Sequence, residues 1–384
     1  MGKALVPQSA PDIVDAIADA IRDGEKLAIT GGGSKAAIGA CVPARRLEMA
    51  GLRGVVDYDP AELVLTVRPG TPLAEIQATV EQAGQMLAFE PFDHGPIFGQ
   101  PEGAATIGGV VAAGVSGSQR LSGGAVRDHL LGFRAVSGRG EIFTAGARVV
   151  KNVTGFDLPK LAAGSWGRLF AMTELTLKVL PRPREAVTRL ISGLDVGRAV
   201  SAMSRAMGSQ ADVAAAAHFP AGLSGGASAT ILRVQGFGPS VSARCRMLDA
   251  LLAEFGSVAT LPPEEADAMW MALRTLEPLG QHAPLWRINV PPSRARQVID
   301  ALPQDAVALL DWAGGLIWVA ADIDPGTVRA AAQDAGGHAM LLRADDRLRA
   351  RVPAFHPQPG GVAALEERVR RAFDPAGLFE TGRF

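Results

Sequence analysis

A run of small, almost uncharged residues at 101–124, PEGAATIGGVVAAGVSGSQRLSGG, constrains this chain more than any other feature. Ile107, Val110 and Val111 interleave with its glycines at core spacing, which flexible linkers rarely show. Glycine clusters bring backbone close to a ligand or supply positions that need a positive φ angle. We therefore predict backbone packed against a ligand here.

A second glycine cluster, Gly31–Lys35, follows a short apolar run typical of a strand. Glycines let successive backbone N–H groups converge on one anion, to which Ser34 adds a hydroxyl and Lys35 a positive charge. The loop is therefore a candidate pyrophosphate cradle, with a plain tight turn as the alternative.

The same loop also fits the G-x-G-x-x-A dinucleotide fingerprint, with Asp57 at the position of an acidic ribose ligand. That fold needs a helix of several turns directly after the loop. Gly39 and Pro43 leave room for one turn at most, so this NAD-type interpretation is disfavoured. The sequence holds no G-x-x-x-x-G-K-[ST] loop, which excludes a P-loop nucleoside triphosphatase.

Composition limits the class further. The 384 residues are 48% hydrophobic and 20% charged, enough for about two domains, and the net charge of -1 excludes the basic surface of a nucleic-acid binder. The two cysteines of the sequence, Cys41 and Cys245, are far apart along the chain. We therefore expect no disulfide framework, no zinc or iron–sulfur site and no other metal. No apolar run approaches the roughly 18 residues of a membrane span, and we expect a cytoplasmic protein.

Local patterns predict the elements. Ser9 with Asp12 resembles a capping box, and the helix it begins is expected to end at Gly24. From 185 to 345, amphipathic stretches such as Gly197–Met207 alternate with strand-like runs, typical of an α+β domain whose helices cover one face of an antiparallel sheet. Val362–Phe373 predicts a last helix.

Several motifs recur in order in one family: Gly31–Lys35, the segments ATIGG and GVSG within 105–117, RDHLLG at 127–132, KNVTGFDL at 151–158 and LAAGSWG at 161–167. With them the chain resembles the vanillyl-alcohol-oxidase-type (PCMH-type) FAD-binding family, and within it the FAD-binding subunits of bacterial glycolate oxidase. The resemblance covers residues 5–183 and, less closely, the terminal FDPAGLF segment.

The resemblance implies an α+β fold: a PCMH-type FAD-binding domain of two α/β subdomains at 1–183, an α+β cap domain with an antiparallel sheet at 184–345, and a segment at 346–384 that returns to the FAD domain. The cap would cover the isoalloxazine. The implied cofactor-binding residues are Gly31, Gly32, Gly33, Ser34, Lys35, Thr106, Ile107, Gly108, Gly109, Gly114, Ser116, Gly117, Gly155, Asp157, Gly164, Gly167, Thr173 and Glu174.

The chain departs from the family at informative places. Some relatives attach FAD through a His in the first glycine loop, where this chain has Ser34 and Lys35, so the expected FAD is non-covalent. Trp166 replaces an acidic or small residue, and Glu380-Thr-Gly382 stands where Asn-Pro-Gly is usual.

The His-rich G-D-G-N-x-H motif of the catalytic 2-hydroxy-acid dehydrogenases of this family is missing from 185–384. Hydride removal from a hydroxy acid needs a base and cations that hold the carboxylate. His94 and His129 adjoin the flavin-lining segments, and Arg287 lies in a strand-like run, so these three are the catalytic candidates. Packing roles for the histidines and a solvated strand position for the arginine are the alternatives.

The resemblance implies the FAD-binding subunit of a complex that oxidises glycolate to glyoxylate, with substrate chemistry mainly on a larger catalytic FAD subunit and an iron–sulfur subunit as the other partner. Its place would be cytoplasmic, or peripheral at the inner membrane through the complex. Two alternatives stay open: a self-sufficient FAD-dependent 2-hydroxy-acid dehydrogenase, and a non-redox assembly scaffold with a vestigial flavin fold.

Overall fold

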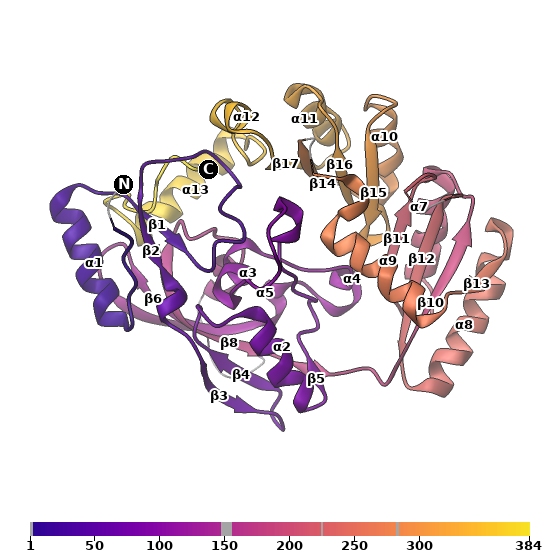
Figure 1. Cartoon of the computed structure of the whole chain (residues 1–384), viewed down its shortest axis with the longest axis horizontal. Helices are drawn as coiled ribbons and strands as arrows, with labels where there is room; N and C mark the ends of the chain where they lie inside the picture. The colour runs from indigo at the N-terminus through magenta and orange to yellow at the C-terminus, as the bar shows by residue number, and fades with distance from the viewer. Residues whose placement is uncertain (1–2, 147–155, 224–225, 282–283) are drawn as a thin grey trace. The chain divides into compact units, whose positions relative to one another are not determined.

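The computed structural model describes residues 3–146, 156–223, 226–281 and 284–384. The described chain forms two compact units (Figure 1). Unit 1 takes in 1–117, 124–182 and 357–384, and unit 2 takes in 118–123 and 183–356. Unit 2 therefore extends to 356 rather than to 345, and it also takes in a short excursion from within the predicted FAD domain.

The described part of unit 1 contains a parallel pair of strands, a five-stranded antiparallel sheet and a further antiparallel pair of short strands. Its elements are α1 (Ala10–Asp23), β1 (Leu27–Thr30), β2 (Arg45–Glu48), β3 (Val55–Asp59), β4 (Val64–Val67), α2 (Leu73–Gln82), β5 (Gln85–Met86), α3 (Ile107–Ala113), α5 (Val126–His129), β6 (Leu130–Ser137), β7 (Ile142–Gly146), α6 (Leu158–Ala162), β8 (Phe170–Lys178), β9 (Leu180–Pro181) and α13 (Gly360–Phe373). Strands β1 and β2 pair in parallel, and five strands form an antiparallel sheet in the order β3-β4-β8-β6-β7.

Helix α1 shows why the local patterns were informative. The hydroxyl of Ser9 accepts from the N–H of Asp12 at 3.3 Å, and the Asp12 carboxylate accepts from the N–H of Ser9 at 3.1 Å, which confirms the capping box. Gly24 ends the helix with a φ of 66°, as predicted. Ile13 and Ile17 are fully buried against β1 and β2 in one hydrophobic core.

Unit 2 is an antiparallel sheet with helices on both faces: most pack into one core, and the helix at 263–275 lies on the opposite face, where Trp270 donates to the Thr188 hydroxyl and contacts Arg233. Its elements are α4 (Arg120–Gly123), β10 (Glu185–Ser192), α7 (Val196–Met207), β11 (Val213–Phe219), β12 (Ala229–Gly236), α8 (Gly238–Leu252), β13 (Val258–Thr260), α9 (Pro263–Thr275), β14 (Leu285–Asn289), α10 (Ala295–Asp300), β15 (Val307–Asp311), β16 (Leu316–Ala320), α11 (Pro325–Asp334), β17 (His338–Arg343) and α12 (Asp346–Arg351). The strand order is β13-β10-β12-β11-β15-β16-β14-β17, and every described pairing is antiparallel.

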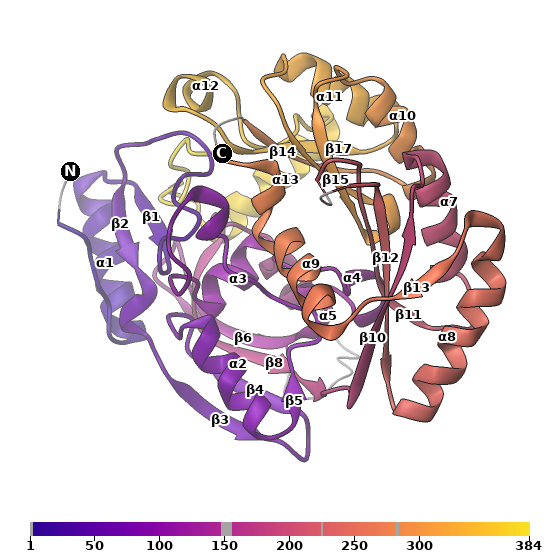
Figure 2. The ribbon, with the colours of Figure 1, turned by 45° about the vertical axis from the view of Figure 1, so that its right-hand side comes forward.

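One large core lies between this sheet and its helices. Alternate strand residues such as Trp286 and Ile288 pack with Met203 of α7 and Leu248 of α8, and Figure 2 shows both helices along the same face. Arg287, between the two buried strand residues, belongs to the opposite face of the sheet. The predicted α+β architecture with an antiparallel sheet is confirmed.

Candidate functional site

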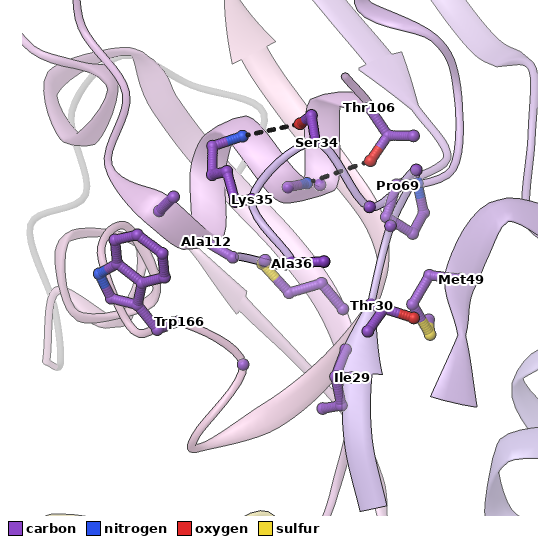
Figure 3. Close-up of a pocket in the computed structure, with 18 of the residues that line it drawn as sticks. Ile29, Thr30, Ser34, Lys35, Ala36, Met49, Pro69, Thr106, Ala112 and Trp166 are labelled. Carbon is purple, nitrogen blue, oxygen red and sulfur yellow. Dashed lines mark hydrogen bonds between the residues drawn. The ribbon is translucent and has the colours of Figure 1, made fainter. Parts of the chain in front are cut away.

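A pocket with about 800 Å³ of empty space, part of it open to solvent, lies within unit 1 (Figure 3). It is built by the loop after β1, the start of α3, the turn before β8 and the C-terminal segment. Its lining residues are Ile29, Thr30, Gly31, Gly32, Gly33, Ser34, Lys35, Ala36, Met49, Pro69, Thr106, Gly108, Gly109, Ala112, Ala113, Trp166, Gly167, Phe170, Met172 and Arg383.

The first wall of the pocket is the glycine loop. A Cβ on Gly31 would lie 2.2 Å from the hydroxyl of Thr106, and one on Gly32 would lie 1.7 Å from the carbonyl oxygen of Ala104, so neither position admits a side chain. Gly33 has a φ of 84°. Within the described chain, the backbone N–H groups of 32–35 donate to no protein acceptor, which leaves four successive donors beside the pocket.

Lys35 adds the charge to this loop. Its Nζ lies 3.4 Å from the hydroxyl of Ser34, which is buried. Burial lowers the pKa of Lys35 to about 8, and the negative charge of Asp93 opposes that shift. A half-buried ammonium beside free N–H donors fits a phosphate-bearing ligand, because such a ligand brings acceptors and the missing negative charge together.

The second wall is the start of α3. The Thr106 hydroxyl caps the helix by accepting from the N–H of Gly109 at 3.3 Å. The N–H of Gly108 donates to the carbonyl of Pro69 at 2.8 Å, and a Cβ at Gly108 would lie 2.6 Å from the Cβ of Pro69. The glycines of the T-I-G-G segment thus allow the helix to pack directly against the strand-end at Pro69.

Asp93 holds the segment that leads into the second wall. Its buried carboxylate accepts from the N–H groups of Gly95, Gly103 and Ala105 at 2.8, 2.9 and 3.0 Å. This fixes the segment that runs into Thr106. Asp93 is a site-shaping residue that the sequence reasoning missed, because nothing local distinguishes it from a surface aspartate.

The C-terminal segment contributes the remaining cation. Arg383 lines the pocket and donates through Nε to the carbonyl of Ile38 at 2.8 Å and through Nη2 to the carbonyl of Lys35 at 2.6 Å. A network of ion pairs anchors the chain just before this segment: Arg168 and Arg370 each pair with both Glu366 and Glu380.

The structure brings part of the predicted cofactor set together. Nine of its members line the pocket: Gly31, Gly32, Gly33, Ser34, Lys35, Thr106, Gly108, Gly109 and Gly167. Pocket-lining residues that the sequence reasoning did not assign include Met49, Pro69, Ala112, Phe170 and Arg383.

The other predicted residues lie outside this lining. Ile107 is fully buried in the core, the Ser116 hydroxyl accepts from the N–H of Val126, and Glu174 pairs with Arg134. Asp157 is exposed and pairs with Lys160. Gly155 falls outside the described residues. The remaining four, which also stand apart from the pocket lining, are Gly114, Gly117, Gly164 and Thr173.

The two candidate histidines are buried in unit 1 away from the pocket lining. His94 stacks on Phe92 with ring centroids 4.7 Å apart, and His129 lies 5.4 Å from the ring of Phe89 at a tilt of 45°. The surroundings of both histidines are those of side chains packed in a core, which matches the alternative of a packing role.

Arg287 lies in unit 2, in a cluster of cations and indoles. Its guanidinium carbon is 5.3 Å from the ring centre of Trp312 and 5.8 Å from that of Trp318, and the guanidinium carbon of Arg120 is 4.6 Å from the ring centre of Trp312. Burial, with a smaller effect from the charge of Arg120, lowers the pKa of Arg287 to about 10. It is half-buried, which does not match the alternative of a solvated strand arginine.

Among the described residues, the structure contains no group of three or more His, Cys, Asp or Glu side chains that could hold a metal ion. Likewise, the described helices include none that is both long and apolar enough to cross a membrane.

Comparison with known proteins agrees with this geometry. The family model described as "FAD binding domain" matches residues 3–146, the part of the chain that carries the glycine loop and α3. Two solved structures share the fold: p-cresol methylhydroxylase (TM-score 0.72, 13% identity, 99% of this chain and 88% of that one) and an alkyldihydroxyacetonephosphate synthase (TM-score 0.71, 15% identity, 98% and 76%). The fold and the pocket define an FAD-binding, PCMH-type flavoprotein.

The sequence relatives narrow the class. The chain is 35% identical to the glycolate oxidase subunit GlcE of Escherichia coli (strain K12) over 97% of this chain and 96% of that one. A D-lactate dehydrogenase of Anaerostipes hadrus is 32% identical over 38% of this chain and 29% of that one. The chain therefore belongs to the GlcE family of FAD-dependent oxidoreductase subunits.

Proposed function

We propose that this chain is the FAD-binding subunit of a glycolate oxidase or dehydrogenase complex that oxidises glycolate to glyoxylate. The observation that carries the proposal is the similarity to GlcE along almost the whole of both chains. A resemblance that covers only 38% of the chain, as with the D-lactate dehydrogenase, would not by itself support this function.

FAD binding is supported by the chemistry of the pocket. The free N–H donors of Gly32 to Lys35 fit a pyrophosphate, and Lys35 and Arg383 supply positive charge beside it. When bound, FAD supplies the two-electron chemistry, and these residues hold and orient it. The loop offers the hydroxyl of Ser34 and the amine of Lys35 where some relatives carry the attaching His, so FAD is held non-covalently.

The role of the chain in the complex is flavin binding and electron relay, with substrate chemistry mainly on a larger catalytic FAD subunit. Cys41 is exposed, Cys245 is buried, and the two cannot supply the four thiolates of a cluster. Electrons therefore leave through FAD to another chain, for which an iron–sulfur subunit is the partner. We propose a cytoplasmic location for this subunit, or a peripheral one at the inner membrane through its complex.

The test is a visible absorption spectrum of the purified full chain, followed by anaerobic addition of glycolate. A flavin spectrum that glycolate does not bleach, with FAD released by denaturation, supports an accessory flavin subunit. Addition of the catalytic partner should then allow glycolate to bleach the flavin. A colourless protein that takes up no added FAD overturns the proposal and favours the assembly scaffold.

The Arg287 cluster favours a second candidate, a dehydrogenase that acts on 2-hydroxy acids without a partner. Arg287 donates no hydrogen bond within the described chain; the charge of Arg120 repels it and the charge of Asp311 attracts it. A half-buried guanidinium whose N–H donors have no acceptor within the described chain suits the carboxylate of a hydroxy acid. If the isolated chain is bleached by glycolate or lactate, R287Q should abolish that bleaching and leave the flavin content unchanged.

A further inference from the structure

Trp166 holds an unusual place in the pocket wall. It lines the pocket, is half-buried and has a φ of 55°. Its neighbours Gly164 and Gly167 have φ values of 87° and 70°, so the same turn uses glycine at its other left-handed positions. A side chain at such a φ is disfavoured, and it persists where the surroundings hold it in place.

The backbone around Trp166 is held by hydrogen bonds to the end of α3. Its N–H donates to the carbonyl of Ala112 at 2.8 Å, and the N–H of Gly164 donates to the carbonyl of Val111 at 3.0 Å. The orientation of the residue is therefore fixed to the same helix whose first turn lines the pocket.

The indole is supported from the C-terminal segment. Its ring centroid lies 5.2 Å from that of Phe384, with a tilt of 58° between the rings, and the guanidinium carbon of Arg383 lies 4.9 Å from the centre of the Phe384 ring. Arg383 is also bonded to the carbonyls of Ile38 and Lys35. Phe384 thus supports the indole, and Arg383, which packs on Phe384, holds the glycine loop.

Phe170, the other aromatic residue of the lining, packs its ring in the hydrophobic core. Its ring stacks on Phe133 at 5.0 Å and meets Phe143 and Phe373 edge-on, and its exposed fraction is 2%. Trp166 presents its indole to the pocket across from Met49 and Pro69, as Figure 3 shows. A fixed aromatic surface in a pocket whose charged side chains gather at the glycine loop suits a planar conjugated ring.

We propose that Trp166 binds a heterocyclic ring of the dinucleotide by stacking, with Phe384 as its support. The inference rests on the proposed FAD binding and extends it to a residue outside the phosphate cradle. FAD offers two such rings, the adenine and the isoalloxazine, and both have the π-face that an indole recognises. The loss of one aromatic stacking partner weakens the binding of a ring by about tenfold.

The test uses the full chain stripped of flavin and titrated with FAD, ADP and FMN by calorimetry. W166G deletes the ring while suiting the positive φ, and W166F keeps a ring. F237L removes an exposed aromatic side chain of unit 2 and serves as the control for aromatic loss away from the pocket. We expect W166G to bind FAD about tenfold more weakly than the wild type, and W166F and F237L to stay within about threefold.

The smaller ligands distinguish the rings. Parallel weakening of FAD and ADP with FMN unchanged assigns Trp166 to the adenine, and parallel weakening of FAD and FMN assigns it to the isoalloxazine. A W166G chain that melts cooperatively and binds all three ligands as the wild type does overturns the inference and leaves the proposed function intact. A wild-type chain that binds none of them overturns both.

Discussion

The guanidinium of Arg383 donates a hydrogen bond to the backbone carbonyl of Lys35, 2.6 Å away and 348 positions earlier in the sequence. A second bond, to the carbonyl of Ile38, makes the contact bidentate to one loop. The C-terminal segment therefore fixes the curvature of the loop that presents the anion donors. The conformation of this N-terminal loop therefore depends on a residue next to the C-terminus.

Replacement of Arg383 by Gln should weaken FAD binding. Each hydrogen bond from a charged donor contributes about 1.5–3 kcal/mol, so partial loss of two should raise the Kd for FAD by roughly tenfold to a hundredfold. This Kd can be measured by the quenching of flavin fluorescence when FAD is titrated with the protein. Arg22 has a side chain that is 68% exposed, and R22Q is the matched control, for which an unchanged Kd is expected. A Kd for R383Q equal to that of the wild type would contradict the bracing role.

Gly32→Ala should disrupt the loop. The added Cβ would lie 1.7 Å from the carbonyl oxygen of Ala104, a backbone atom that cannot rotate away, so the loop must shift. We expect FAD content after purification to fall to a small fraction of the wild-type value. Gly361, in α13, has no atom within 4 Å of an added Cβ, and G361A should keep full flavin content. Normal flavin content in G32A would show that the loop is not the cradle.

Sequence reasoning located this loop because its determinants are local. Glycines directly after an apolar strand indicate an anion-binding loop, and this pattern can be recognised without knowing where the strand lies in the fold. The pocket residues that it missed depend on tertiary contacts: Arg383 reaches the loop from the far end of the chain, and Met49 enters from the turn after β2.

Helix α3 was also missed, for a different reason. Gly108 and Gly109 are poor helix formers, so the T-I-G-G segment carries no helical signal. The helix forms because Thr106 caps it and because Gly108 packs against Pro69 without a side chain between them. The motif glycines were expected to lie against the ligand, yet Gly108 serves the packing of the protein itself as well.

Lys35 gives FAD binding a pH dependence. Its pKa of about 8 in the flavin-free chain means that the ammonium is lost as the pH rises through 8, and the cradle then loses a positive charge. The apparent Kd for FAD should therefore rise by up to about tenfold between pH 7 and pH 9. K35M should bind FAD more weakly at pH 7 and show a flatter profile. An equally steep rise in K35M would assign the dependence to another group.

Asp93 should prove important for stability as well as for the pocket. Asp93→Asn keeps the size of the side chain but replaces one carboxylate oxygen with an NH₂ group, which cannot accept from the N–H groups of Gly103 and Ala105. We expect a loss of about 2–4 kcal/mol in the free energy of unfolding, measured by urea denaturation. D59N alters an exposed aspartate of β3 that caps its own turn and should cost about 1 kcal/mol or less.

His218 should make unit 2 sensitive to acid. It is 1% exposed, its Nδ1 lies 2.9 Å from the hydroxyl of Thr230, and burial lowers its pKa from 6.5 to about 4. Because the folded state binds this proton less readily than the unfolded state, stability is full above pH 6.5 and falls as the pH drops toward 4. A shift of this size corresponds to roughly 3 kcal/mol.

Urea denaturation of the wild type and of H218Q at pH 7.5 and pH 4.5 measures this effect. Glutamine keeps a polar group near Thr230 and does not titrate, so H218Q should be less stable than the wild type at pH 7.5 but should lose less on acidification. The difference between the two pH dependences isolates the proton taken up by His218 from that of the carboxylates. Equal losses in both chains would show that His218 is not the group whose protonation destabilises unit 2.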